Sequence, residues 1–577
     1  MPLETDQPQG FEFSLTDEIN SGIWFTDFTT RIPLWANGDN IRFTDFGVEP
    51  VKGRSEILAT ASGEPIRGIT QIIENTNKSA IFGDLAKLYK WDFGDTSETT
   101  VGGGYTGNEF GGATVWDSGT TTWDSGSTTW DEGVNEASVW DFTDFGSFVL
   151  ATNNKDVPQI RTTNVEFNNL QDGVTNVVID TPGTGYAVSE ALTFTGGGGS
   201  GAAGIISAIG GSGEITEITI TDAGSGYTSA PTVGFTTTSG SGGAATAYVS
   251  NFPETTVKVF VTSGPHVLGF NVASNSRKFI WCSADDLDDW VATSTNTAGA
   301  LIIREASSQI RCVAPLGNAL AVYTEDQMFV VQYVGLPNVF GYRPAIDGIG
   351  AVSHKAVQSI GSRNFGLSSQ GFYETDGVQF NYIDAPIKDY FQDNIAVGEY
   401  PQVYSYHNEQ EAEIEWTVPF GSSIPSRQFI YNYEKGTWST RTTDLSSYAP
   451  RRVFNNALSG SYTGELFNEE TTQTDDGAAI TSSIRTKPVE FGDADRIKQI
   501  TSIRIGHKGS GLQFRLGWSE TSDGVINWQS YQNVSAGFSF QPVRIAGRYI
   551  YLELYSDTAT TWDVQDITVQ GRFAGTR

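Results

Sequence analysis

The residues best suited to chemistry in this sequence are its carboxylates, and the densest group runs from Asp285 to Asp289 and ends at Trp290. Carboxylate oxygens are the ligands that Ca²⁺ accepts in proteins. The run lacks the Asp-x-Asp-x-Asp-Gly spacing of a calcium loop, so a solvated turn or a helix cap is the interpretation that the residues favour. A bound calcium ion is the alternative.

A second acidic group consists of Glu409, Glu411, Glu413 and Glu415. The four residues alternate along a predicted strand, and alternate residues of a strand share one face. We expect either an exposed face of a sheet or the wall of a negatively charged passage. The group is the one candidate site that the sequence offers.

Patterns of known catalytic and cofactor sites are missing. The four histidines (His266, His354, His407 and His507) stand in no zinc-binding spacing. The glycine stretch Gly196 to Gly199 has no following lysine and no strand-to-helix context, so it does not predict a phosphate loop. With 67 acids, accidental carboxylate pairs are inevitable and do not indicate a glycosidase. We therefore expect no catalytic residues, no metal, no cofactor and no enzyme activity.

A tryptophan repeat with seven-residue spacing begins at Trp116-Asp-Ser-Gly119 and recurs from Trp123 and from Trp130. It comes close to the Asp box, a hairpin of sialidase-like propellers, but its aromatic residue comes one position late. Asp-x-Gly supplies turn geometry. We therefore predict a structural repeat of strand, turn and strand.

The composition bounds the class of protein. Glycine accounts for 65 of 577 residues and aromatic residues for 12%, which favours short strands joined by tight turns. The net charge of −32 argues against a surface that grips DNA, because phosphate contacts need clusters of Lys and Arg. Cys282 and Cys312 are too few for a disulfide framework. No signal peptide is visible at Met1 to Asp6 and apolar runs such as Phe329–Val331 are too short to span a bilayer, so we expect a soluble protein made in a cytoplasm.

A unit of strand, Asx or Gly turn, and strand recurs along the chain. Turns near residues 285, 325 and 370 lie about 40–45 residues apart, the spacing of four-stranded propeller blades. We predict an all-β fold with a β-propeller of about six to eight blades over 66–475. A chain of β-sandwiches is the alternative.

An inserted module has its own internal repeat. Gly183-Thr-Gly-Tyr186 recurs 41 residues later as Gly224-Ser-Gly-Tyr227. We predict a two-copy, Gly-rich β-module over 168–255. Alternating strands over 476–577 predict a C-terminal β-sandwich-like domain, and a β segment over 1–65 could pack with it.

Several motifs, taken in order along the chain, resemble the tail nozzle family (tail tubular protein B or tail hub type) of podoviruses, the short-tailed double-stranded DNA phages. The resemblance covers most of the chain except about 100–135 and 168–255. The residues that carry it are Trp35 to Phe43 with Gly47, Pro50 and Lys52-Gly53; Trp140 to Gly146 with Val149 to Asn153 and Pro158-Gln159; Asn275 to Trp290; Tyr333 to Pro337; Gly371 to Tyr373 with Asp376-Gly377; Gly547 to Tyr549; and Gly571-Arg572.

The resemblance implies a virion structural protein of the phage tail. Its copies, commonly six, would form a ring below the portal and the tail adaptor protein, near the tail fibres or spikes. Double-stranded DNA would be retained by this ring and ejected through it without tight binding. A receptor-binding or carbohydrate-binding adhesin of the tail is the alternative, because of the aromatic repeats and the Gly-Ser-Gly-Tyr module.

Overall fold

The chain folds almost entirely into antiparallel β-strands, as the sequence predicts. The computed structural model describes residues 10–16, 19–23, 34–58, 62–74, 76–106, 138–162, 166–236, 239–493, 495–535, 537 and 539–575. The structure contains a short α-helix, α1 (Lys388–Asn394), and a 3-10 helix, η2 (Val397–Gln402). The predicted tryptophan repeat at 116–133 lies outside the described residues.

Seven four-stranded antiparallel sheets make up the centre of the molecule, and six of them are built from strands consecutive in the sequence. The sheets are β6 (Gly68–Glu74), β7 (Asn77–Gly83), β8 (Lys87–Asp92) and β9 (Thr99–Gly103); β10 (Asp141–Phe145), β11 (Phe148–Thr152), β12 (Gln159–Arg161) and β13 (Asn168–Asn169); β20 (Val257–Ser263), β21 (His266–Val272), β22 (Asn275–Trp281) and β23 (Gly299–Ile302); β24 (Cys312–Leu316), β25 (Ala319–Tyr323), β26 (Gln327–Gly335) and β27 (Val339–Asp347); β28 (Val357–Ile360), β29 (Arg363–Ser368), β30 (Gly371–Thr375) and β31 (Phe380–Tyr382); β32 (Tyr404–Asn408), β33 (Glu413–Val418), β34 (Arg427–Asn432) and β35 (Thr437–Thr442); and β36 (Leu445–Ala449), β37 (Leu458–Ser461), β38 (Leu466–Thr472) and β5 (Gly53–Leu58).

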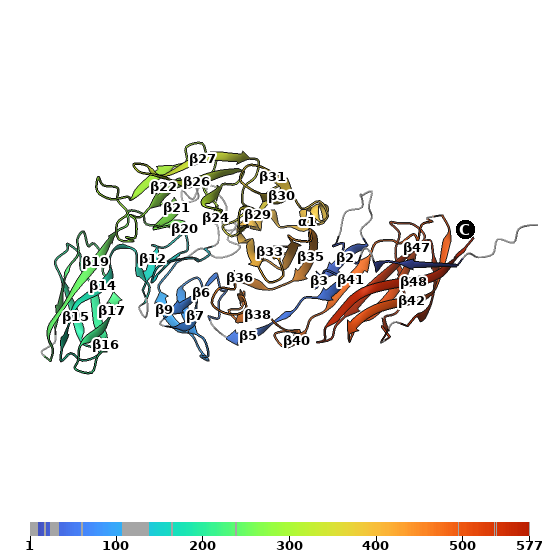
Figure 1. Ribbon diagram of the computed structural model, residues 1–577, viewed down its shortest axis with the longest axis horizontal. Helices are drawn as coiled ribbons and strands as arrows, with labels where there is room; N and C mark the ends of the chain where they lie inside the picture. Colours follow the sequence, from blue (N-terminus) through green and yellow to red (C-terminus); the bar gives the residue numbers. More distant parts are fainter. Residues whose placement is uncertain are drawn as a thin grey trace, which may run out of the picture.

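These seven sheets close on themselves. The first strand of each sheet contacts the first strand of the next, from β6 through β10, β20, β24, β28 and β32 to β36, and β36 contacts β6 again. Figure 1 shows the sheets grouped around a common centre. Buried aromatic and aliphatic side chains fill the spaces between neighbouring sheets, for example Phe372 against Trp416 and Trp438. We call this assembly of seven sheets the ring.

The last sheet of the ring is completed by a strand from the other end of the chain. β5 pairs antiparallel with β38, and Leu58 lies beside Leu466. The sequence pattern assigns residues 53–58 to the N-terminal segment, whereas the structure places them in the ring. Local spacing does not reveal such a pairing because the two strands are far apart in the sequence.

The module predicted over 168–255 is a six-stranded sheet inserted between β13 and β20, and its first strand also contacts its last, so the sheet is nearly closed. In sheet order the strands are β14 (Gln171–Thr184), β19 (Ser241–Asn251), β18 (Thr232–Phe235), β15 (Ala191–Thr195), β16 (Ala203–Ile209) and β17 (Ile215–Asp222). We call these strands the inserted module.

The repeat in this module produces two matching tyrosine clasps. Tyr186 and Tyr227 are both buried, and each lies against glycines of the other copy. A β-carbon at Gly240 would lie 2.5 Å from the ring of Tyr186, and one at Gly199 would lie 2.5 Å from the ring of Tyr227. Gly199 and Gly240 are themselves 41 positions apart. The two copies are therefore related by pseudo-symmetry, and the tyrosine of each copy packs on a glycine of the other. Both rings need the bare glycine backbone beneath them.

The first and last parts of the chain fold together into a two-sheet body. One sheet contains β3 (Ile41–Phe43), β4 (Val48–Pro50), β48 (Trp562–Ala574), β42 (Ile497–Gly509) and β46 (Gln541–Gly547), with β1 (Gly10–Ser14) beside β48; the other contains β2 (Trp35–Asp39), β41 (Ser482–Thr486), β47 (Tyr549–Ser556), β43 (Gln513–Ser519) and β44 (Asn527–Trp528), with β45 (Gln532–Asn533) beside β43. Both sheets contribute to one apolar core that includes Trp35, Ile503, Phe514 and Trp562. A short hairpin, β39 (Thr474–Asp475) and β40 (Ala478–Ala479), lies between this body and the ring in the sequence.

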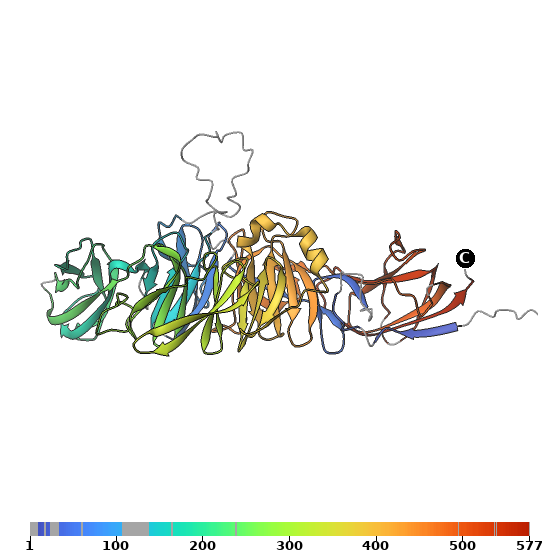
Figure 2. The ribbon, with the colours of Figure 1, turned by 90° about the horizontal axis from the view of Figure 1, so that it is seen from above.

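The inserted module, the ring and the two-sheet body lie in one row, with the ring in the middle (Figures 1 and 2). No helix in the described ranges is long and apolar enough to cross a membrane.

The tyrosine clasps can be tested with single methyl groups. We expect Gly199→Ala and Gly240→Ala each to destabilise the inserted module by about 1–3 kcal/mol, because a methyl group there overlaps a buried ring. Hydrogen exchange should become faster over 171–251. Gly211→Ala is the matched control, since a β-carbon at Gly211 meets no atom within 4 Å. Unchanged exchange in the two clasp variants would contradict the packing.

Candidate functional site

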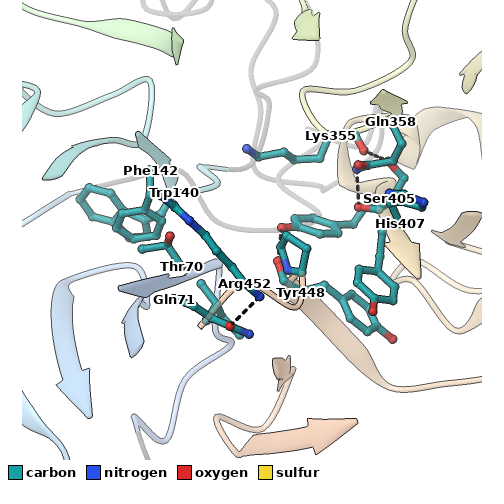
Figure 3. A pocket seen from close by; sticks show the side chains of 14 residues that line it. Thr70, Gln71, Trp140, Phe142, Lys355, Gln358, Ser405, His407, Tyr448 and Arg452 are labelled. Carbon is teal, nitrogen blue, oxygen red and sulfur yellow. Dashed lines mark hydrogen bonds between the residues drawn. The ribbon is translucent and has the colours of Figure 1, made fainter. Parts of the chain in front are cut away.

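A polar cavity of about 290 Å³ lies where the first strands of the ring converge. Five of the seven sheets contribute to its wall, and Figure 3 shows side chains from several of them pointing toward a common centre. The residues that line it are Ile69, Thr70, Gln71, Trp140, Phe142, Lys355, Gln358, Tyr404, Ser405, Tyr406, His407, Tyr448, Pro450 and Arg452.

A buried ion pair stands on one side of this cavity. The Lys355 ammonium donates to Asp141 Oδ1, and the backbone N–H of Phe260 donates to Asp141 Oδ2 at 3.1 Å. Burial alone would raise the pKa of Asp141, but Lys355 and the ring of His354, 3.5 Å away, hold it well below its ordinary value. Burial lowers the pKa of His354. The pair therefore consists of a carboxylate and an ammonium beside a neutral imidazole.

A second cation, Arg452, enters the cavity from the loop after β36. Its guanidinium pairs with Asp144. The loop is held by Gln71 on β6, whose side-chain oxygen accepts the backbone N–H groups of Arg452, Val453 and Phe454 at 3.1, 2.9 and 3.0 Å. The Arg452 side chain is 59% exposed and belongs to the cavity lining.

Aromatic rings form much of the remaining wall. Trp140 donates its indole N–H to the carbonyl of Asp84 at 2.7 Å and stacks on Phe142, with ring centroids 6.4 Å apart. Tyr406 stacks on Tyr448, with centroids 5.2 Å apart. These fixed rings give the cavity flat, apolar surfaces beside its two cations.

The glutamates predicted to form one acidic face do not do so. Glu409 is exposed and Glu411 is half-buried in the turn between β32 and β33, whereas Glu413 and Glu415 on β33 are 2% and 4% exposed. Glu413 and Glu415 do share one face of the strand, but this face is covered. β33 is an interior strand of its sheet, and arginines from distant strands approach the two carboxylates.

Arg42 on β3 is the centre of this buried cluster. Its guanidinium donates to both oxygens of Glu413 at 2.9–3.0 Å and to Glu470 on β38 at 2.5 Å. Burial raises the pKa of Glu413. Burial would also raise the pKa of Glu470, but Arg42 lowers it below its ordinary value. The cluster joins the two-sheet body to two sheets of the ring.

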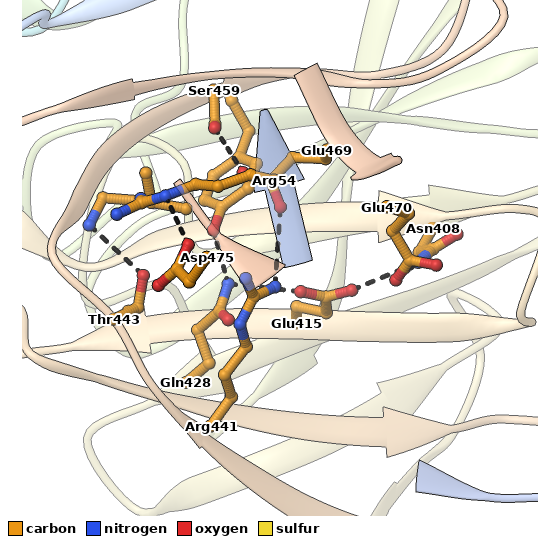
Figure 4. Close-up of polar contacts among 12 residues, drawn as sticks. Arg54, Asn408, Glu415, Gln428, Arg441, Thr443, Ser459, Glu469, Glu470 and Asp475 are labelled. Carbon is orange, nitrogen blue, oxygen red and sulfur yellow. Dashed lines mark hydrogen bonds and ion pairs between the residues drawn. The ribbon is translucent and has the colours of Figure 1, made fainter. Parts of the chain in front are cut away.

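Glu415 lies deeper in the same cluster and is held by two side-chain amides (Figure 4). Its two oxygens accept from the amides of Asn408 at 3.3 Å and Gln428 at 3.2 Å. Burial, together with the charges of Glu413 and Glu470, raises the pKa of Glu415 to about 8. At neutral pH this side chain is therefore mostly protonated.

The acidic run 285–290 fastens the inserted module to the ring. Asp288 accepts from Thr175 Oγ1 on β14 at 2.6 Å, and Asp289 accepts from the amide of Asn251 on β19 at 3.0 Å. Burial raises the pKa of Asp288 to about 6. No group of three metal-binding side chains occurs in the described part of the chain. The run is a turn whose hydrogen bonds hold both strands that enter and leave the module.

The histidines and cysteines are dispersed. His266 Nδ1 lies 2.8 Å from the carbonyl of Cys282, and His407 Nε2 lies 3.2 Å from the hydroxyl of Tyr433. Cys282 and Cys312 are free and buried, and burial raises the pKa of each thiol to about 12. A thiol with so high a pKa is a poor nucleophile at neutral pH.

The sequence did not single out the residues of the central cavity. Lys355 precedes β28 and Arg452 follows β36, so the two residues share no local spacing. The available signal was modest: His354-Lys355 and Arg451-Arg452 are basic pairs in an acidic chain, and Asp141 falls inside a motif of the family resemblance.

No family model and no curated protein matches the chain. Among solved structures it is similar to the computationally designed Ika8 protein, at 9% identity and a TM-score of 0.34, over 72% of this chain and 99% of that chain. It is also similar to PorZ, a surface component of the type-IX secretion system of Porphyromonas gingivalis, at 10% identity and a TM-score of 0.33, over 77% and 40%. A third is the extracellular domain of a putative hybrid two-component system from B. thetaiotaomicron, at 8% and 0.27, over 78% and 43%. Likenesses at these scores identify no function.

The protonation of Glu415 makes a prediction for stability. Between pH about 4.5 and 8, Glu415 keeps its proton in the folded chain but has lost it in the unfolded chain. The free energy of unfolding therefore falls as pH rises, by about 1.4 kcal/mol per pH unit. Glu415→Gln removes this loss. We expect thermal unfolding to show the variant more stable than wild type at pH 8, with the difference shrinking toward pH 5.

Glu409→Gln is the control for this experiment because Glu409 is exposed. The substitution at Glu415 can be accommodated, since the side-chain oxygen of Gln428 has no hydrogen-bond partner in the described ranges and can accept after its amide rotates. Parallel pH profiles for wild type and Glu415→Gln would show that Glu415 is already ionised.

Proposed function

We propose that the ring is a seven-bladed β-propeller and that the two-sheet body is a β-sandwich. Three features support this reading of the ring: the order of strands within each sheet, the cycle of contacts among the first strands, and the completion of the last sheet by β5. Because β5 directly precedes β6 in the sequence and pairs with β38, it joins the first and last sheets of the circle by backbone hydrogen bonds.

We further propose that the protein is a virion structural protein that forms the tail nozzle of a short-tailed phage. The observation that carries this proposal is that buried polar contacts join the ring to the two-sheet body on one side and to the inserted module on the other. Arg42 joins the two-sheet body to Glu413 and Glu470, and Thr175 joins the inserted module to Asp288. The shifted ionisable groups hold three bodies together, which suits a part that transmits force.

The residues that carry the family resemblance agree with a mechanical role. Trp140, Trp281 and Trp290 are buried, and each donates its indole N–H to a backbone carbonyl. Arg42 lies at the centre of the buried cluster. These residues build the fold, so the resemblance bears on architecture and assembly.

The passage for DNA would have to lie between copies of the chain. The central cavity of the ring holds about 290 Å³, enough for a small molecule. A DNA duplex is far larger, since its major groove alone is about 12 Å wide and 8.5 Å deep. At −32 per chain, six copies would carry about −192 charges, and such walls would repel a duplex at close range.

Electron microscopy of the intact tail is the direct test. We expect several copies arranged as a closed ring around a bore wide enough for a duplex, between the adaptor above and the fibres or spikes around it. Purified protein should bind double-stranded DNA only weakly at physiological salt. Isolated single copies in the particle, or sub-micromolar DNA binding at that salt, would contradict the proposal.

A tail adhesin is the second candidate, and one surface favours it. On the outer face of the sheet that contains β43, the Arg515 guanidinium lies 4.4 Å from the ring centre of Trp528 and 4.5 Å from that of Tyr531. Tyr531 is partly exposed and also donates to Glu553 at 2.9 Å. Aromatic rings beside polar groups are suited to binding sugars. Binding to a glycan array that Trp528→Ala abolishes would favour the adhesin over the nozzle.

A further inference from the structure

The lining of the central cavity differs in charge from the chain as a whole. The sequence holds 67 acids and 35 bases, yet the lining contains two cations, Lys355 and Arg452, and no carboxylate. Their partners Asp141 and Asp144 are not among the lining residues. A molecule in the cavity therefore meets positive groups first.

Both cations keep hydrogen-bond donors for a further partner. Lys355 has three N–H donors and gives one to Asp141. Arg452 pairs with Asp144 through Nη1, while its Nε and Nη2 bond to nothing in the described ranges. Guanidinium and ammonium groups with free donors are the usual partners of a carboxylate or a phosphate.

The rest of the lining offers neutral polar atoms beside flat rings. The Thr70 hydroxyl and the side-chain oxygen of Gln358 belong to lining residues and have no hydrogen-bond partner in the described part of the chain. Trp140 and Phe142 form an apolar wall on the Thr70 side of the cavity (Figure 3). Hydroxyl groups of a ligand can bond to these two polar atoms while its carbon skeleton lies on the rings.

We propose that this cavity binds a small hydroxylated carboxylate of the sugar-acid class. Its carboxylate lies between Lys355 and Arg452, and its hydroxyls bond to Thr70 and Gln358. A volume of about 290 Å³ is at the lower end of small-molecule sites and limits the ligand to about one sugar unit. Binding of this kind is independent of the assembly of copies into a tail.

Isothermal titration of the full-length chain tests the proposal with a matched pair of probes. Glucuronate carries the carboxylate, and glucose has the same ring without it. We expect saturable binding of glucuronate at millimolar concentration, at least tenfold weaker binding of glucose, and weaker binding of glucuronate as salt is added.

Arg452→Gln is the variant that locates the site, because the exposed guanidinium can be replaced without opening the core. It should weaken glucuronate binding at least tenfold. Arg343→Gln, on the exposed outer strand β27, is the control and should leave binding unchanged. The proposal is overturned by a flat titration with glucuronate, which would mean that water alone fills the cavity, by equal binding of glucose, or by full binding in Arg452→Gln.

Discussion

The pairing of β5 with β38 is the contact on which the rest of the molecule depends. It brings Leu58 beside Leu466 and gives the last sheet of the ring its fourth strand. Without β5 this sheet would have three strands, and the circle of seven sheets would be held by side-chain packing alone. The loop that the pairing closes is very long, but the entropy cost of closing a loop grows only slowly with its length.

The same pairing decides where the two-sheet body can form. Because β5 pairs with β38, the chain enters the ring after β4 close to the place where it later leaves the ring after β38. The first and last parts of the chain therefore meet and build two sheets around one core. Arg42 on β3 then reaches Glu413 and Glu470 in the ring. One guanidinium beside two buried carboxylates is costly to desolvate, so its value lies in fixing one arrangement of the two bodies.

Much of the fold class could be predicted from the sequence. Glycine, aromatic residues and short alternating runs indicated an all-β chain, which the structure confirms. The 41-residue offset pointed to a repeated module. The structure gives the physical reason for the repeat, since Tyr186 and Tyr227 each pack on a glycine of the other copy. The burial of Glu413 and Glu415 could not be predicted. Alternation shows that they share a face, but Arg42, which covers that face, comes from a strand about 370 positions earlier.

The residues of the central cavity were hidden for a related reason. The cycle of first strands brings side chains from five of the seven sheets to the centre, so a site there is assembled from positions that are tens or hundreds of residues apart. No local motif can record such a set. Only the structure shows that Lys355 and Arg452 line one cavity whose lining has no carboxylate, in a chain with 67 acids. Repulsion of a duplex, as proposed for the assembled tail, depends on the net charge of the chain, whereas ligand binding, as proposed for the cavity, depends on these two cations.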